Sequence, residues 1–129
     1  MINAQAFVHY KTGIKHLDEQ HWELFLNLDA LAACDNKDAA IAVIDNVIHQ
    51  WALHSQAEEE YMAKIHYPFL APHAEHHILF LEKFYNLKKQ IKTTNFQYGI
   101  KFHVAQLEEI LRHHIEFDDL QYADFEKKK

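Results

Sequence analysis

The sequence His-Ala-Glu-His-His at residues 73–77 decides the fold of this chain, and it follows Tyr-Pro-Phe-Leu-Ala-Pro at residues 67–72. Pro72 suits the first position of a helix, because the first turn leaves its amide hydrogens without helical partners. Residues four apart lie on one face of a helix, so we expect His73 and His77 one turn apart on the same face. Upstream, His54 and Glu58 have the same spacing. Two such pairs on consecutive helices can face each other and hold metal.

The composition indicates one helical domain, residues 1–129. A chain of 129 residues can bury a substantial core. Two glycines and two prolines give few turn signals, which favours long helices with few connections. Histidine is unusually frequent, with twelve copies.

Charge and cysteine content narrow the function classes. The formal net charge of -6 argues against a partner nucleic acid. The single cysteine, Cys34, excludes an internal disulfide and fits a reducing compartment. No basic segment precedes an apolar run at the N-terminus, and no apolar run reaches the ~20 residues of a membrane helix. We therefore expect a cytoplasmic protein, monomeric and not embedded in a membrane.

Helical spacing of apolar residues predicts four helices, at roughly residues 14–34, 38–65, 72–91 and 96–117. Residues 1–13 are predicted to be an irregular arm, and residues 117–129 a short tail that loses the pattern. Four amphipathic helices joined by short breaks predict an all-α fold, an antiparallel up-down-up-down four-helix bundle.

This topology makes a prediction about the polar residues on the apolar stripes. Counted at ~1.5 Å per residue from the helix ends, all of them fall near one end of the bundle. They are His21, His54, Glu58, His73, His77 and His114. Burying them is costly unless something satisfies them, and metal is the usual partner. Five imidazoles are too many for one structural zinc ion, so the set suits two metal ions with a bridging carboxylate. Ligation without sulfur favours iron, manganese or zinc.

The ordered set His21, His54-x3-Glu58, His73-x3-His77, His114-x4-Asp119 resembles the hemerythrin family in its single-domain bacterial form. The resemblance covers roughly residues 10–122. Supporting context is found at Gly13-Ile14, Asp18, Gln20, Tyr67-Pro68 and Tyr122. Each element alone is weak, but the ordered set is specific.

The resemblance implies a non-haem diiron centre that binds dioxygen reversibly, in a protein that is a carrier and not an enzyme. One iron would take His73, His77 and His114, the other His21 and His54, with Glu58, Asp119 and an oxo or hydroxo group bridging. Dioxygen would bind as a hydroperoxide at an open position of the second iron. The implied role is oxygen transport, storage or delivery to an oxygen-consuming enzyme.

A dry apolar wall around the site would keep the bound hydroperoxide from being protonated further, so that oxygen leaves as dioxygen. Helical offsets from the ligands suggest Leu24, Phe25, Ile110, Leu111 and Ile115 for this wall. The family often has tryptophan at the position of Ile110, so the shape of the pocket is expected to differ here.

The last carboxylate is the least regular member of the set. Asp119 is five residues after His114, about 140° around an ideal helix, whereas Asp118 at four residues shares its face. The family pattern selects Asp119, which requires the helix to deform or end there. Asp118 is the alternative.

The remaining histidines are predicted to have no ligand role. Six are expected on the surface: His9, His16, His49, His66, His76 and His113. His103 lies about 16 Å along its helix from His114 and is expected to be a buried polar or groove residue. In the run Glu58-Glu59-Glu60, one ligand is expected beside two solvated charges.

Three other functions compete with oxygen carriage. An oxygen or redox sensor, or a protein handling iron or nitric oxide, would act through a partner protein. A diiron oxidase or ferritin-like protein needs Glu-x-x-His on two helices, and no glutamate here has a histidine three residues later. A zinc site is disfavoured by the number of ligands.

Overall fold

The computed structural model describes residues 2–94 and 99–129, and all regular secondary structure in these ranges is helical. Its helices are α1 (Ala4–Phe7), the 3₁₀ turn η1 (Val8–Tyr10), α2 (Lys15–Ala32), α3 (Lys37–Lys64), α4 (Leu70–Thr93), α5 (Ile100–His114), the π-helical turn η2 (Ile115–Asp119) and α6 (Leu120–Lys127). The prediction of an all-helical fold is confirmed for these residues.

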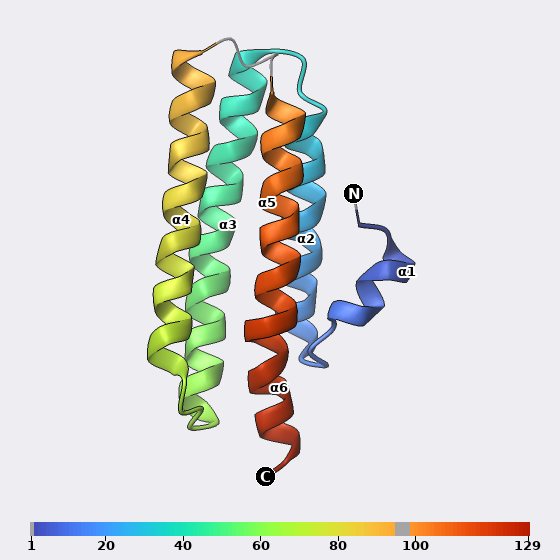
Figure 1. The fold of residues 1–129 in the computed structure, drawn as a ribbon, viewed down its shortest axis with the longest axis vertical. Helices are drawn as coiled ribbons and strands as arrows, with labels where there is room; N and C mark the ends of the chain where they lie inside the picture. Colours follow the sequence, from blue (N-terminus) through green and yellow to red (C-terminus); the bar gives the residue numbers. More distant parts are fainter. Residues whose placement is uncertain (1, 95–98) are drawn as a thin grey trace.

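Four long helices, α2 to α5, lie side by side as a bundle, and α6 continues the line of α5 beyond it (Figure 1). The closely packed pairs are α3 with α4, α2 with α3, and α2 with α5. Helix α1 lies outside the bundle, beside α2 (Figure 1). No helix in the two described ranges has both the length and the apolar character that a membrane crossing needs.

The apolar core is divided into two parts along the bundle. The larger part surrounds Trp51 and Phe84, and the smaller one contains Leu17, Met62 and Tyr122. On α2 and α3 the polar residues of the sequence motif come between the two parts. On α2, for example, His21 lies between Leu17 of the smaller cluster and Leu24 of the larger. A polar layer is therefore enclosed by apolar layers on both sides.

Local signals place some helix ends, and the structure corrects others. Asn36 caps α3, with its side-chain oxygen accepting a hydrogen bond from Ala39 N at 2.8 Å. Helix α4 begins at Leu70 and not at Pro72. Proline is tolerated at its third position because the first four amides of a helix have no helical acceptor. The predicted start of the last helix, residue 96, lies outside the described residues.

The C-terminal tail predicted from residue 117 is wrong, because the chain stays helical to Lys127. The turn η2 is π-helical, which adds one residue to a turn and shifts the face that later residues present. The apolar residues after the π turn therefore no longer fit the α-helical spacing of α5, although the chain is still helical. The shift brings Tyr122 into the core, where it is fully buried.

The N-terminal segment, predicted to be irregular, contains α1 and η1. Its connection to the bundle depends on Asp18 in the first turn of α2. One carboxylate oxygen of Asp18 accepts hydrogen bonds from Thr12 N (2.7 Å) and Thr12 Oγ1 (2.8 Å), and the other accepts from Gly13 N (3.0 Å). Thr12 and Asp18 are both buried, so the two donors of Thr12 have no easy access to water.

Replacing Asp18 with alanine should lower the free energy of unfolding by about 1–3 kcal/mol, because the buried donors of Thr12 lose their acceptor. Urea unfolding followed by circular dichroism measures the change. The control is Glu19→Ala, since that neighbouring side chain is largely exposed and its ion pair with Lys15 is 4.0 Å long. Equal stability of the two variants would contradict the anchoring role of Asp18.

Candidate metal centre

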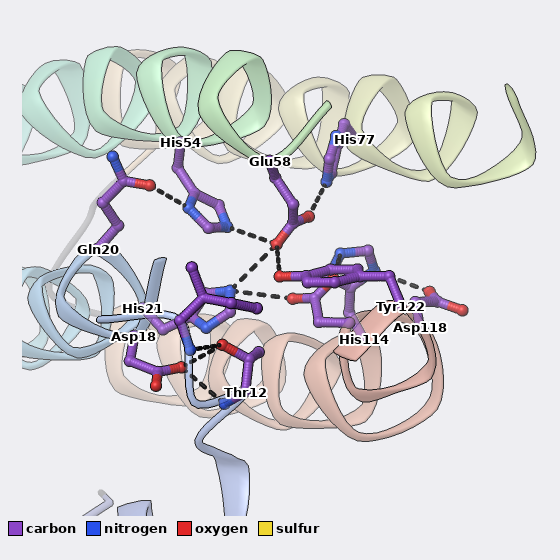
Figure 2. A network of polar contacts seen from close by, with 12 residues as sticks. Thr12, Asp18, Gln20, His21, His54, Glu58, His77, His114, Asp118 and Tyr122 are labelled. Atoms are coloured by element: carbon purple, nitrogen blue, oxygen red, sulfur yellow. Dashed lines mark hydrogen bonds and ion pairs between the residues drawn. The ribbon is translucent and has the colours of Figure 1, made fainter. Parts of the chain in front are cut away.

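Seven buried side chains converge between the helices, and all seven belong to the motif found in the sequence. They come from every long helix and from η2: His21 (α2), His54 and Glu58 (α3), His73 and His77 (α4), His114 (α5) and Asp119 (η2). Four of them have no exposed surface, and the three others are 3–5% exposed. Figure 2 shows the cluster around Glu58.

Glu58 lies at the middle of the cluster and divides its two oxygens between two sets of imidazoles. Its Oε1 is 2.8 Å from His73 Nε2 and 2.7 Å from His77 Nε2. Its Oε2 is 3.2 Å from His54 Nε2 and 3.5 Å from His21 Nε2. A carboxylate in this position can serve two cations, one through each oxygen.

Asp119 divides its oxygens in the same way. Its Oδ1 is 2.8 Å from His73 Nε2 and 3.1 Å from His114 Nε2. Its Oδ2 is 2.9 Å from His21 Nε2. The donors therefore form two groups, one with three histidines and one with two. Both groups contain Glu58 and Asp119, and within each group the donor atoms lie within 4.8 Å of one another.

The π-helical turn explains why Asp119, and not Asp118, points into this cluster. His114 is the last residue of α5 and Asp119 the last of η2. In a π-helix the hydrogen bond spans five residues, so residues five apart come onto the same face. Asp119 is fully buried, whereas the side chain of Asp118 is 28% exposed and binds the outer side of His114.

Several buried donor and acceptor atoms of the cluster make close contacts but no hydrogen bond of good geometry. Within the described residues these include both ring nitrogens of His21, Nε2 of His54 and His114, and both oxygens of Asp119. Buried polar atoms left this way are expensive, and a cation between them would satisfy imidazole nitrogens and carboxylate oxygens together. The donor set fits two metal ions that bind nitrogen and oxygen ligands.

The outward ring nitrogens of three histidines have partners that fix the ring orientation. His54 Nδ1 lies 2.7 Å from Gln20 Oε1, His77 Nδ1 2.7 Å from Glu59 Oε2, and His114 Nδ1 2.8 Å from Asp118 Oδ2. Such partners keep Nε2 free to bind a metal and make the imidazole a better ligand. Glu59 was predicted to be a solvated charge, and its side chain is 35% exposed, but it also contacts His77. Its partner is on the next helix, which spacing within one helix cannot indicate.

Two aromatic residues close the cluster from either side. The Tyr122 hydroxyl donates to Glu58 Oε2 at 2.9 Å, and Trp51 Nε1 donates to the carbonyl of His77 at 2.9 Å. The ring of Trp51 lies against those of His54, His77 and His114, with centroids 5.4–5.9 Å apart. These contacts hold the histidines in place from the apolar side.

The charges of the cluster shift the pKa values of its members in opposite directions. Burial alone lowers the pKa of His21, but contacts with Asp119 and Glu58 outweigh it and raise the pKa to about 9. The same balance raises the pKa of His73 to about 9 and that of His114 to about 10. Burial would raise the pKa of Glu58, yet the histidines around it lower it well below its usual value. Metal binding would replace the protons on these histidines.

These shifts make the stability of the metal-free chain depend on pH. A histidine whose pKa is higher in the folded than in the unfolded chain stabilises the fold fully below pH 6.5, and this contribution is lost as pH rises through about 9. Burial lowers the pKa of His54, so this histidine changes the stability in the opposite direction. The three histidines with raised pKa values outweigh it.

The urea midpoint of the metal-free chain should therefore be lower at pH 9.5 than at pH 6.5. Urea titrations in the presence of a chelator measure it. His21→Gln should weaken the dependence, while His49→Ala, which changes an exposed histidine, should leave it as it is. A midpoint that rises with pH would contradict this account.

The residues predicted for a dry apolar wall divide into two sets. Leu24, Phe25, Leu111 and Ile115 are buried in the larger core cluster. Ile110 is 37% exposed and lines a surface cavity, so its assignment to a dry interior wall is corrected. It lies one position from Leu111 on α5, which turns it away from the bundle axis toward solvent.

The other histidines lie outside the seven-residue cluster. All six that were predicted at the surface are exposed, and His103 is half-buried near Gly99. His76 nevertheless has a partner, since its Nδ1 lies 2.9 Å from Asp118 Oδ2. The sequence showed no signal for this contact, because the two residues are on different helices.

A model of the family described as hemerythrin HHE cation-binding domain matches residues 12–125 of the 129-residue chain. The chain belongs to the hemerythrin HHE family. Comparisons with curated proteins and with solved structures gave no match. The matched range contains all seven clustered residues, so the family assignment and the buried cluster together make this a metal-binding HHE domain.

Proposed function

We propose that this HHE domain binds two iron ions in the buried cluster and uses them to bind dioxygen reversibly. The proposal rests on how the carboxylate oxygens of Glu58 and Asp119 are placed. Each carboxylate directs one oxygen to each of the two groups of histidines. His73, His77 and His114 would hold one iron, and His21 and His54 the other. The group with two histidines has fewer protein ligands, which leaves room there for dioxygen.

The architecture proposed for this site is a single-domain antiparallel up-down-up-down bundle. The packed pairs α2–α3 and α3–α4 are consecutive helices, and α5 packs on α2, which supports that order around the bundle. Consecutive helices joined by short turns are antiparallel neighbours in such bundles.

If bound by these residues, a ferrous pair would supply the two electrons that reversible oxygen binding needs. The chain's own residues keep the site dry and its charge low. Glu58 and Asp119 offset half of the four positive charges of two ferrous ions. The buried apolar residues Leu24, Phe25 and Leu111 exclude water, which would otherwise bring protons to the site.

Tyr122 is the one hydroxyl that contacts a carboxylate of the cluster among the residues described. Burial, together with the charge of Glu58, raises the pKa of Tyr122 far above its usual value, so the hydroxyl keeps its proton. Because that proton is already donated to Glu58, it is held in place and not available for release to bound oxygen. This arrangement favours a carrier over an enzyme that consumes oxygen.

The test is to load the protein with ferrous iron under anaerobic conditions and to cycle it between oxygen-free and oxygenated buffer. We expect two irons per chain and a visible charge-transfer band that appears with oxygen and disappears when oxygen is removed. Iron that oxidises once and does not return would favour a redox sensor or an iron- or nitric-oxide-handling protein. A protein that binds no iron, or that is isolated with zinc already in the site, would reject the proposal.

The two adjacent aspartates provide a matched pair of variants for the ligand assignment. Asp119→Asn should reduce bound iron below two per chain, because amide nitrogen and oxygen cannot replace a bridging carboxylate. Asp118→Asn should retain two irons at equilibrium, since Asp118 contacts the outer nitrogen of His114 and His76 but no inner nitrogen of the cluster. Iron content by plasma emission after desalting measures both. The reverse result would identify Asp118 as the bridging residue.

We further propose that the protein works in the cytoplasm as a monomer and delivers oxygen to an oxygen-consuming enzyme. The free Cys34 supports a reducing compartment. Sedimentation of the iron-loaded protein tests the oligomeric state directly.

A further inference from the structure

A second polar cluster lies on the outer side of the metal centre and shares only His114 with it. Asp118 Oδ2 is 2.9 Å from His76 Nδ1 and 2.8 Å from His114 Nδ1. These three donors lie within 4.8 Å of one another. His76 comes from α4, whereas the two others come from the end of α5 and from η2. Two imidazoles and one carboxylate are a common ligand set for a divalent metal ion.

This outer cluster opens into a surface cavity of about 400 Å³ between α4 and α5. His76, His114 and Asp118 line the cavity together with His113 and Glu109, and Lys83 is the cation on its wall. His114 is thus shared by the cavity and the buried centre. The cavity therefore reaches the buried centre at a ligand that both sites can use.

The buried centre is not accessible to a metal ion from solvent, and a ligand shared with the surface cavity would help the ion to reach it. His21, His54, Glu58 and Asp119 have no exposed surface, so a hydrated cation cannot meet them directly from solvent. A divalent ion releases its water in steps, and protein ligands at the surface can replace part of that water first. His76 has a side chain that is 48% exposed and can make the first contact.

His114 faces each of the two sites with a different ring nitrogen. Its Nδ1 faces Asp118 at 2.8 Å, and its Nε2 faces Asp119 at 3.1 Å. A metal ion at the outer cluster would therefore lie across one imidazole ring from the buried centre. The outer cluster has three protein ligands, and one of them, His76, is exposed, which suits brief binding.

We propose that His76, Asp118 and His114 form an outer metal site that takes up ferrous iron from solution and passes it to the buried centre. This inference rests on the proposed function, because it requires the buried centre to be an iron site. It assigns to His76 a role in loading that is separate from oxygen binding. It also assigns a second role to Asp118, which otherwise only orients His114.

The test measures the rate and the endpoint of iron uptake separately. Metal-free protein is mixed with ferrous iron under anaerobic conditions, and free iron is captured at successive times with a coloured chelator. His76→Ala should slow uptake by about tenfold, a size taken from the affinity that a metal site loses with an outer partner, and should still reach the endpoint of the unmodified protein. His76→Glu, which restores a ligand, should recover much of the rate.

The control is His49→Ala, which removes another exposed histidine of a bundle helix and should leave uptake unchanged. Circular dichroism checks that each variant is folded. An unchanged rate in His76→Ala would overturn the inference, and so would a lower iron endpoint, because His76 would then be a permanent ligand. If the unmodified protein itself binds fewer than two irons, it is the proposed function that fails.

Discussion

Two carboxylates buried among five imidazoles are the interaction on which the rest of this structure depends. Glu58 and Asp119 have no exposed surface, and each contacts histidines of both groups. A buried charge without partners would destabilise the fold strongly, so the histidines are needed wherever the carboxylates are. The four long helices must then lie in an order that brings all seven side chains together.

The apolar core is arranged to keep this polar layer in place. The larger cluster around Trp51 covers it on one side, and the smaller cluster with Leu17, Met62 and Tyr122 covers it on the other. Trp51 and Tyr122 also donate hydrogen bonds, to the carbonyl of His77 and to Glu58. The same residues therefore exclude water and orient the polar groups. Dryness and ligand geometry have a common origin in this packing.

A single π-helical turn connects the local backbone to the chemistry. Without it, Asp118 would share the face of His114 and Asp119 would point elsewhere. With it, Asp119 enters the buried layer and Asp118 becomes the outer partner of His114 and His76. One additional residue in a turn thus separates an inner carboxylate from an outer one, and the outer one opens to solvent.

The sequence alone determined much of the fold and nearly all of the cluster. Helical spacing identified the long helices, and histidines and a glutamate on apolar stripes identified the polar layer, because both depend on positions within one helix. The resemblance to the hemerythrin family supplied Asp119, which ideal helical spacing did not favour.

Only the tertiary structure decided the remaining features. Glu59 and His76 gain their partners, His77 and Asp118, from other helices. Ile110 faces solvent, and the predicted tail is helical because the π turn shifts its phase. The physical reason is the same in each case. Periodicity describes the faces of one helix, whereas these features depend on how two helices pack or on a change in the period itself.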